Sequence, residues 1–176
     1  MLTRHFRTKN GSDVVLEPAT PNDAQGLFEL ELAIVRDGRG VVRSEQDVQL
    51  DGVRSVDATN ELGAQLIARA AESGAIVGEA SLRRLKGALV RHVAVAALGV
   101  HPSWQAQGLG RALMQGLLDW ARATAVERVE LYTRADNMRA RALYASLGFK
   151  EEAVRARFIR LGPEPYVDDV VMCMFL

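Results

Sequence analysis

The sequence predicts a mixed α/β fold, a single domain in which a mainly antiparallel sheet is flanked by helices. Three observations support this prediction. Short runs of apolar or alternating residues, typical of strands, fill the middle of the chain, and two segments with helical periodicity follow them. A strand–helix–strand step over residues 92–134 implies one parallel pair with a right-handed crossover. A length of 176 residues, 48% of them apolar and 25% charged, suits one domain over residues 1–176.

The first sixty residues predict a strand followed by helical structure. Residues 1–10 are basic but have no apolar core behind them, so they are not a signal peptide and are expected to form a solvated, mobile leader. A short strand is expected at 14–16. A helix should begin at Pro21–Asp23 and end at Gly38–Gly40. Residues 44–60 are mixed and polar and predict a short helix and a loop.

The middle of the chain predicts an antiparallel meander of three strands. Residues 66–71 and 75–82 have strand character, and Glu72–Gly74 between them is a turn of the kind that joins hairpin strands. Residues 92–100 form a further strand that is dense in Val and Ala. Such a composition is typical of a strand buried on both faces, and we expect that here.

The period then changes to that of a helix. Apolar residues fall at 109, 113, 117 and 121, with Met114 and Leu118 beside them, which predicts a helix with one buried stripe. The remaining expected elements are a strand at 128–133, a helix at 136–147 with Gly148 as its C-cap glycine, and strand regions from Phe149 and over 167–176.

Composition excludes several classes of function. Lys+Arg and Asp+Glu both number 22, so the net charge is zero and nucleic acid is not an expected partner. No apolar run approaches the ~20 residues of a membrane span, so no membrane is expected either. The single cysteine, Cys173, rules out an internal disulfide and fits the cytoplasm. No Cys/His cluster has ligand spacing, so we expect no metal.

The most informative segment is the loop Trp104–Leu113, which lies between the strand at 92–100 and the helix that follows. Gly108 and Gly110 stand at the entrance of this helix, where unpaired N–H groups and the helix dipole form an anion site. Arg111 adds a charged donor there, while Gln105 and Gln107 add neutral ones. A glycine-rich turn without a ligand is the alternative.

Two other phosphate-binding loops are excluded by the same segment. A P-loop needs Gly-Lys-Ser/Thr, but Gly110 is followed by Arg111-Ala112. A dinucleotide fingerprint needs a glycine or small residue three positions after Gly110, and Leu113 stands there.

The full segment 98–113 resembles the acetyl-CoA-binding motif of the GNAT superfamily of N-acetyltransferases, which reads Gln/Arg-x-x-Gly-x-Gly/Ala. Gln105, Gly108 and Gly110 match it. Residues 136–149 are similar to the second cofactor motif of the family, and the residues that match there are Asn137, Ala140, Leu143, Tyr144, Gly148 and Phe149. The resemblance covers residues 64–176 well, whereas the first sixty residues match only in their strand-then-helix pattern.

The resemblance implies an acetyl-CoA site between two neighbouring parallel strands, 92–100 and 128–134, that splay apart. A bulge near Leu98–Gly99 is expected to help part them. The diphosphate is expected on residues 105–111, and backbone groups freed by the splay bond the pantetheine arm. Asn137 and Tyr144, seven residues apart, are expected on one helix face toward this arm and the sulfur. The implied cofactor-binding residues are Leu98, Gly99, Val100, Gln105, Ala106, Gln107, Gly108, Leu109, Gly110, Arg111, Asn137, Ala140, Leu143 and Tyr144.

The implied activity is transfer of an acetyl group from acetyl-CoA, as co-substrate, to a primary amine by direct attack in a ternary complex. Tyr144 is the expected general acid, and a backbone N–H near Leu98 or Gly99 is expected to stabilise the oxyanion. Relatives often carry a glutamate base three residues before the Leu98 position, where this chain has Val95. Glu79, on the adjacent strand, is the best replacement, while His92 or a water chain are alternatives. Cys173, between two methionines, is expected to be a buried filler.

The acceptor is expected to contact residues 22–60 and the loop at 160–168. A small primary amine, an amino acid, a polyamine and a protein N-terminus all remain open. Glu29, Glu31 and Asp37 are expected to form a wet helix face, with attraction of a cation as the alternative. Tyr166 and Asp168 either line the acceptor pocket or lie at a strand edge. The last strand is a plausible homodimer contact by analogy with the family. A non-catalytic acyl-CoA sensor or interaction module, and a transferase for a longer acyl group, are the alternative functions.

Overall fold

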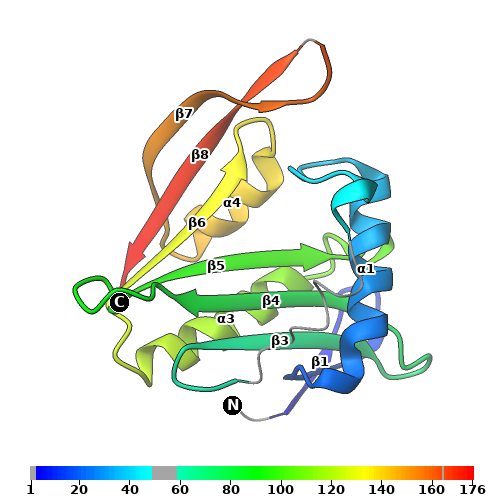
Figure 1. Cartoon of the computed structure of the whole chain (residues 1–176). Coiled ribbons are helices and arrows are strands. Elements are labelled where there is room, and N and C mark those ends of the chain that lie inside the picture. Colours follow the sequence, from blue (N-terminus) through cyan, green and yellow to red (C-terminus); the bar gives the residue numbers. More distant parts are fainter. Residues whose placement is uncertain (1–2, 49–58, 164) are drawn as a thin grey trace.

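The computed structural model describes residues 3–48, 59–163 and 165–176, which form one eight-stranded sheet with helices on both faces (Figure 1). The strand order is β1-β2-β3-β4-β5-β6-β8-β7, and all neighbours are antiparallel except the parallel pair β5–β6. The strands are β1 Arg4–Arg7, β2 Asp13–Pro18, β3 Gly63–Ala70, β4 Ile76–Arg84, β5 Val93–Val100, β6 Arg128–Arg134, β7 Lys150–Arg160 and β8 Tyr166–Phe175. The α-helices are α1 Ala24–Asp37, α3 Leu109–Arg122 and α4 Met138–Ser146, and short 3₁₀ turns lie at Pro21–Asp23, Glu45–Asp47 and Pro102–Trp104.

The expected strands and helices are all present, so the predicted fold class is confirmed. The turn at Glu45–Asp47 agrees with the short helix expected in residues 44–60, whereas 49–58 lie outside the described residues. None of the described helices is long and apolar enough to cross a membrane.

The prediction that residues 1–10 form a mobile leader is wrong for Arg4–Arg7. These residues form β1, an edge strand of the sheet. This strand pairs antiparallel with β2 from Arg4↔Leu16 to Arg7↔Asp13. Its one partly buried side chain, Phe6, packs against the main core, and the turn after it is fixed by hydrogen bonds from Thr8 to Ser12. An inward-facing aromatic residue in a basic segment therefore holds this part of the chain to the sheet.

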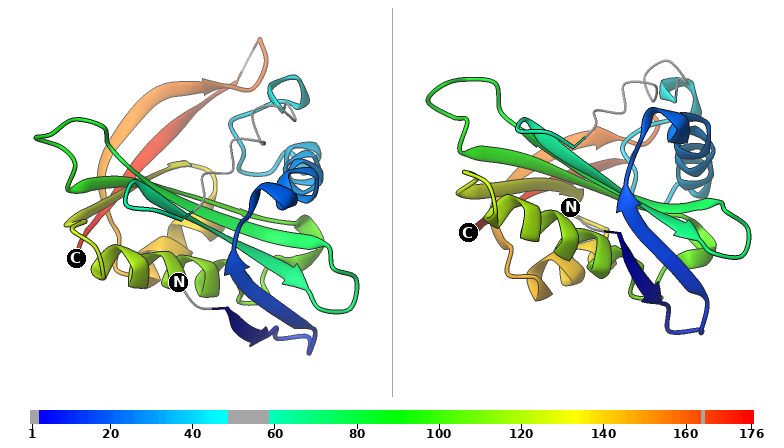
Figure 2. Two further views of the ribbon diagram at one scale, coloured as in Figure 1. Left: turned by 60° about the horizontal axis from the view of Figure 1, so that its bottom comes forward. Right: turned by 90° about the horizontal axis from the view of Figure 1, so that it is seen from below.

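The main core lies between the sheet and α3 (Figure 2). The expected stripe on α3 is fully buried and faces alternate residues of the central strands. Burial of each such leucine contributes roughly 1.5–3 kcal/mol. Glycines allow close approach between α3 and the sheet: an added Cβ atom would lie 2.6 Å from Leu66 at Gly116 of α3, and 3.0 Å from Leu113 at Gly78 of β4. The stripe consists of Leu109, Leu113, Met114, Leu117, Leu118 and Ala121.

A smaller core lies on the opposite face, under α1. Leu27 and Leu30 pack there against Ile67 of β3 and Ile76 of β4, with Ile34 partly buried at the edge. Among the strands, α1 packs mainly on β4 and β5, near the open half of β5.

The feature that positions the functional site is the short pairing of β5 with β6. It covers only three residue pairs, from Val93↔Arg128 to Val95↔Glu130. Beyond them β5 continues along β4, while β6 follows β8 over seven antiparallel pairs. The two strands meet near the C-terminus and fan apart toward α1 (Figure 1). The expected splay of the parallel pair is therefore present.

The expected bulge near Leu98–Gly99 is wrong. The β4–β5 register runs without a shift from Gly78↔Val100 to Arg84↔Ala94, so β5 is regular where it leaves β6. The strands part because β6 is held by β8. The irregularities lie elsewhere: in the β3–β4 pairing at Ala68/Arg69, where Val77 of β4 is the extra residue, and twice in β7.

The expectation that 92–100 is buried on both faces holds only for its first half. Val93, Ala94 and Ala96 are buried, but Ala97 is exposed and the three residues after it are partly exposed. The splay explains the difference, because this half of β5 has lost its neighbour on one edge.

The start of α1 is fixed by a buried carboxylate. Asp23, 8% exposed, accepts hydrogen bonds from the backbone N–H and the hydroxyl of Thr20, both at 2.8 Å, and from Arg69 of β3 at 2.6 Å. Burial alone would raise the pKa of Asp23. The hydrogen bonds from Arg69 and Thr20 outweigh burial and hold this pKa below its usual value.

We predict that Asp23→Asn lowers the free energy of unfolding near neutral pH by about 1–3 kcal/mol, because Arg69 loses a buried charged partner. Since the folded pKa of Asp23 lies below the unfolded one, this stabilisation is present above the unfolded pKa and is lost as the pH falls through the folded pKa. Urea unfolding of both proteins over a range of pH measures the difference. A gap that does not close in acid would contradict the role of the ionised carboxylate.

Candidate functional site

The loop before α3 has the backbone geometry of an anion-binding nest. Ala106 and Gly108 both adopt left-handed conformations, with φ of 62° and 88°. The first bond of the helix runs from the N–H of Ala112 to the carbonyl oxygen of Gly108, at 3.1 Å. The N–H groups of residues 109–111 therefore have no carbonyl partner within the helix, and together with the helix dipole they favour an anion.

This nest lies at the open side of the splayed strands. A Cβ atom on Gly110 would meet Leu98 at 3.3 Å, Leu143 at 3.4 Å and Val100 at 3.7 Å. Four residues implied by the resemblance thus converge from β5, α3 and α4. A small residue at this position therefore lets the first turn of α3 pack closely against β5 and α4.

The polar side chains of the loop bond within the protein. Gln105 donates to the carbonyl oxygen of Val100 at 3.3 Å and accepts from Arg139 of α4 at 2.7 Å. Arg111 donates to the hydroxyl of Ser146 at 2.5 Å. Gln105 thus ties the loop to β5 and α4. The contact of Arg139 with Gln105 was not predicted, because the family motifs that place α4 beside the loop do not include Arg139.

Residue Gln107 is held by the first hairpin of the chain. Its side-chain oxygen accepts from the N–H of Asn10 at 3.0 Å, and its carbonyl oxygen accepts from the N–H of Lys9 at 3.3 Å. Phe6 of β1 lies 3.3 Å from the position of a Cβ atom on Gly108. The β1–β2 hairpin therefore supports the nest from behind, which the leader interpretation did not anticipate.

The helix expected at 136–147 begins at Met138, so Asn137 lies at its entrance rather than within it. Asn137 precedes α4 as its N-cap, with non-helical φ and ψ, and its side-chain oxygen accepts from the N–H of Ala140 at 3.1 Å. Its amide nitrogen packs against Gly40, in the segment after α1. Its carbonyl oxygen accepts the first helical bond, from the N–H of Arg141 at 3.1 Å, so Asn137 caps α4 through both its side chain and its backbone.

Tyr144 lies in the main core, 7% exposed, with its ring edge-on to Phe149 at 6.0 Å between centroids. No hydrogen bond joins its hydroxyl to another of the described residues. Burial raises the pKa of Tyr144 to about 12. The hydroxyl is therefore protonated near neutral pH, so it is available as a hydrogen-bond donor.

Glu79 lies on the other face of the sheet, beside the open half of β5. It is paired with Gly99, and its Cγ atom would lie 3.6 Å from a Cβ atom there. One carboxylate oxygen accepts from the amide nitrogen of Gln65 at 3.1 Å. Burial raises the pKa of Glu79, the hydrogen bond from Gln65 opposes this, and the nearby charge of Glu31 adds to it.

The wet helix face expected for the acidic residues of α1 is correct for Glu29, holds only in part for Asp37, whose side chain is 18% exposed, and is wrong for Glu31. Glu29 is exposed beside Gln25, and Asp37 pairs with Arg39. Glu31 is only 9% exposed and forms an ion pair with Arg43. Its spacing from Leu27 places it on the buried stripe of α1, a signal that the sequence contains.

The other candidate side chains are placed away from the splay or have structural contacts. His92 is exposed just before β5, and Cys173 is buried on β8. Asp168 accepts from the N–H of Arg157 at 2.7 Å, and Arg157 stacks on Tyr166 at 4.5 Å. Tyr166 and Asp168 thus have strand-edge contacts within the β7–β8 hairpin. No group of three or more metal-ligating side chains occurs among the residues described.

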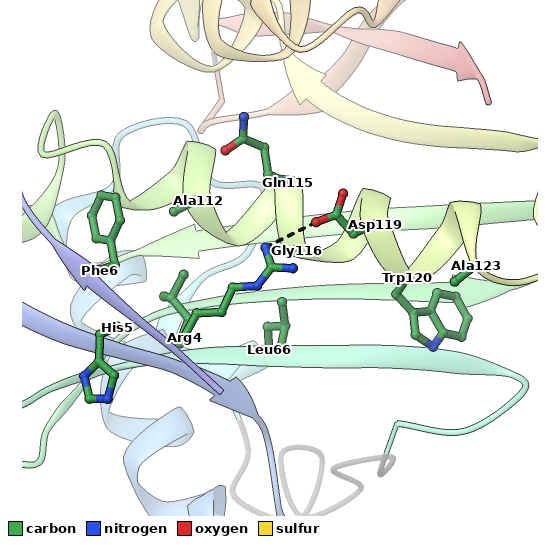
Figure 3. A pocket seen from close by; sticks show the side chains of 11 residues that line it. Arg4, His5, Phe6, Leu66, Ala112, Gln115, Gly116, Asp119, Trp120 and Ala123 are labelled. Atoms are coloured by element: carbon green, nitrogen blue, oxygen red, sulfur yellow. Dashed lines mark hydrogen bonds and ion pairs between the residues drawn. The ribbon is translucent and has the colours of Figure 1, made fainter. Parts of the chain in front are cut away.

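A cavity of about 430 Å³ lies between β1 and α3, outside the splay (Figure 3). Phe6, Leu66 and Trp120 line it, and Arg4 reaches across to Asp119 at 3.2 Å. None of the residues implied in cofactor binding lines this cavity, so it is not part of the site around the nest.

Residues 36–149 match the model of the Acetyltransferase (GNAT) family. The mycothiol acetyltransferase of Beutenbergia cavernae is 54% identical over 61 residues, which cover 35% of this chain and 20% of that protein. The N-alpha-acetyltransferase RimI of Mycobacterium tuberculosis is 39% identical over 98 residues, 55% of this chain and 60% of that one. The [ribosomal protein bS18]-alanine N-acetyltransferase of Escherichia coli is 44% identical over 61 residues, which cover 35% of this chain and 41% of that protein. The chain thus spans from about a fifth to three fifths of these relatives.

Solved structures share the fold along almost the whole chain. An acetyltransferase of the GNAT family from Streptococcus pneumoniae superimposes with a TM-score of 0.85 at 20% identity, covering 93% of this chain and 99% of that one. The protein yncA of Salmonella typhimurium, a putative acetyltransferase solved with its cofactor acetyl-CoA, superimposes with a TM-score of 0.81 at 23% identity. The match covers 94% of this chain and 95% of that one.

Proposed function

Since this chain belongs to the acetyltransferase (GNAT) family, we propose that it transfers the acetyl group of acetyl-CoA directly to a primary amine. The observation that carries the proposal is the open edge of β5 with the nest of residues 106–111 beside it. An anion-binding helix N-terminus next to an unpaired strand edge matches a ligand that has a diphosphate at one end and an amide-containing arm at the other. Support for acetyl-CoA also comes from the yncA structure.

The nest would hold the diphosphate, with the N–H groups of residues 109–111 and the guanidinium of Arg111 as donors. The free edge of β5 at residues 98–100 would bond the amide groups of the arm as an added strand does. Bound there, acetyl-CoA supplies an activated thioester. Leu98, Val100 and Leu143 enclose the approach to Gly110 and exclude water from the arm. The N–H of Leu98 or Gly99 is the proposed donor to the carbonyl oxygen that becomes negative as the amine attacks.

Tyr144 is the proposed proton donor to the departing sulfur. A thiol has a pKa near 8.5, well below the value of about 12 that burial gives Tyr144. Full transfer of the proton is therefore uphill, and the hydroxyl helps mainly by hydrogen bonding to the developing thiolate. Its lack of another partner among the described residues leaves it available for that bond.

Glu79 is the proposed base on the acceptor side. An alkylamine has a pKa near 10.4, so it must lose a proton before or during attack. Glu79 lies beside Gly99, where the amine would approach, and its raised pKa makes the carboxylate a stronger base than an exposed glutamate. The proton passes from the amine to this carboxylate directly or through one water.

The names of two relatives favour one class of acceptor, a protein N-terminus. One of them is an N-alpha-acetyltransferase and another is named for an alanine of ribosomal protein bS18, so a protein N-terminus is a leading candidate beside small amines. A cytoplasmic location fits such an acceptor. The homodimer through the last strand stays a prediction, with Phe175 on that strand 72% exposed.

We predict that acetyl-CoA binds the wild-type protein saturably, with a micromolar dissociation constant, and that Gly108→Trp abolishes binding. Gly108 has a positive φ and Phe6 behind it, so a large side chain must fill the nest. Isothermal titration calorimetry measures this. Gly74→Trp is the matched control, because Gly74 also has a positive φ, 72°, with nothing within 4 Å in its turn. Absence of binding to the folded wild-type protein would refute the transferase proposal, and equal loss in both variants would refute the nest.

Replacement of Tyr144 by Phe is expected to lower kcat by about tenfold, with little change in the dissociation constant for acetyl-CoA, because only a hydrogen bond to the leaving group is lost. The edge-on contact with Phe149 survives the change, so the melting temperature should stay close to that of the wild type. Steady-state release of CoA gives kcat. An unchanged kcat would exclude Tyr144 as the donor.

A further inference from the structure

A glutamine lies inside an otherwise apolar stretch of β3. Gln65 is only 9% exposed, and its chain neighbours Ala64 and Leu66 are buried in the main core. Because side chains alternate between the two faces of a strand, Gln65 lies with Ile67 on the opposite face, the one that α1 covers. A buried amide is costly unless it is hydrogen-bonded, so a glutamine at this position requires an explanation.

The side-chain amide of Gln65 has one hydrogen-bond partner among the described residues, the carboxylate of Glu79. The Nε2 atom of Gln65 donates to Oε2 of Glu79 at 3.1 Å. The Oε1 atom of Gln65 is buried and makes no hydrogen bond with the described residues. A glutamine that only stabilised the fold would be expected to use both ends of its amide. The contact with Glu79 is therefore what this side chain contributes.

The register of the sheet fixes this contact. Ile67 is paired with Glu79 and Gln65 with Ser81, so Gln65 and Glu79 are diagonal neighbours on one face of adjacent strands. Glu79 is paired in turn with Gly99 of β5. Gln65, Glu79 and Gly99 thus form a row that crosses from β3 to the open half of β5.

The two carboxylate oxygens of Glu79 have different surroundings. Oε2 accepts from Gln65, whereas Oε1 lies 3.8 Å from the position of a Cβ atom on Gly99. Gly99 has no side chain to cover Oε1, and a Cβ atom there would lie 2.8 Å from Ile34 of α1. Holding Oε2 on the β3 side therefore turns Oε1 toward the part of β5 where the amine is proposed to attack.

We propose that Gln65 is the positioning residue of the proposed base: it holds Oε2 of Glu79 so that Oε1 faces the amine beside Gly99. Glu79 takes the proton from the amine, while Gln65 touches none of the reacting atoms and acts only through Glu79. The inference rests on the proposed function and deepens it, since it adds a residue on a third strand to the acceptor side of the site.

The contact also affects the pH at which Glu79 is ionised. Burial raises the pKa of Glu79 most, and the hydrogen bond from Gln65 lowers it. Of the nearby charges, Glu31 of α1 raises this pKa, whereas Arg43 from the segment after α1 and Arg83 of β4 lower it. A base must be ionised to accept a proton, so loss of the bond from Gln65 should move the acidic limb of the pH–rate profile to higher pH.

The test replaces Gln65 by Met, an apolar side chain of similar length that cannot donate a hydrogen bond. Release of CoA at saturating acetyl-CoA and saturating L-alaninamide, a small primary amine, gives kcat over a range of pH. On the acidic limb we expect Gln65→Met to lower kcat by roughly tenfold, and the loss to shrink as the pH rises. The dissociation constant for acetyl-CoA should not change. A merely structural role would lower kcat to a similar extent at every pH.

The matched control is Gln25→Met, because Gln25 also donates to a glutamate, Glu29, at 2.9 Å, but on the exposed surface of α1. This variant should leave kcat and the acidic limb unchanged. The double variant Gln65→Met with Glu79→Gln should lose no more activity than Glu79→Gln alone, since Gln65 acts through Glu79. Melting temperatures establish that each variant is folded.

An acidic limb that stays in place in Gln65→Met would overturn the inference, as would a further loss when Gln65→Met is added to Glu79→Gln. Binding of acetyl-CoA without transfer to L-alaninamide or other primary amines would instead overturn the proposed function. Titration of the Glu79 carboxyl carbon by NMR, which needs no acceptor, separates the two failures. Its midpoint should lie at higher pH in Gln65→Met than in the wild type, and equal midpoints would contradict the role of Gln65.

Discussion

The early parting of β5 from β6 is the constraint on which the rest of the structure depends. After three residue pairs, each strand keeps one hydrogen-bonded neighbour, β4 for β5 and β8 for β6, and leaves its other edge unpaired. A buried backbone group without a partner costs about 1–3 kcal/mol, so an edge in the middle of a sheet persists only if water or a ligand reaches it. The splay thus makes a ligand-accessible edge inside a sheet whose two halves are otherwise fully paired.

The two faces of the sheet carry different groups at the splay between β5 and β6. On one face, the N-terminus of α3 and the glycine at 110 bring an anion-binding nest against β5, with Tyr144 buried in the core nearby. On the other face, α1 covers the central strands, and Glu79 of β4 lies beside Gly99 with Gln65 as its hydrogen-bond partner. The proposed site is therefore built from both faces of the sheet at the splay.

The sequence predicts the fold well because its signals are local. Each of these signals determines the structure of the few residues around it. Examples are the apolar stripe on α3, the hairpin turn at Glu72–Gly74 and the glycine that ends α4. The convergence on Gly110 was also implied, through the family motif. The errors have a common physical origin in contacts between distant segments. Phe6 packs β1 against the main core, but the residues next to Phe6 in the sequence give no sign of this contact. The strand β6 leaves β5 by pairing with β8, and no bulge is needed. Glu31 is the exception, because its spacing from Leu27 already placed it on the buried stripe.

Hydrogen–deuterium exchange on addition of acetyl-CoA tests the central claim most directly. If the splay and the nest form one cofactor site, the amides of residues 98–100 and of 108–111 should become protected together, with saturation at the same ligand concentration. Protection confined to other segments, or to only one of these two, would contradict the claim that the unpaired edge of β5 holds the cofactor.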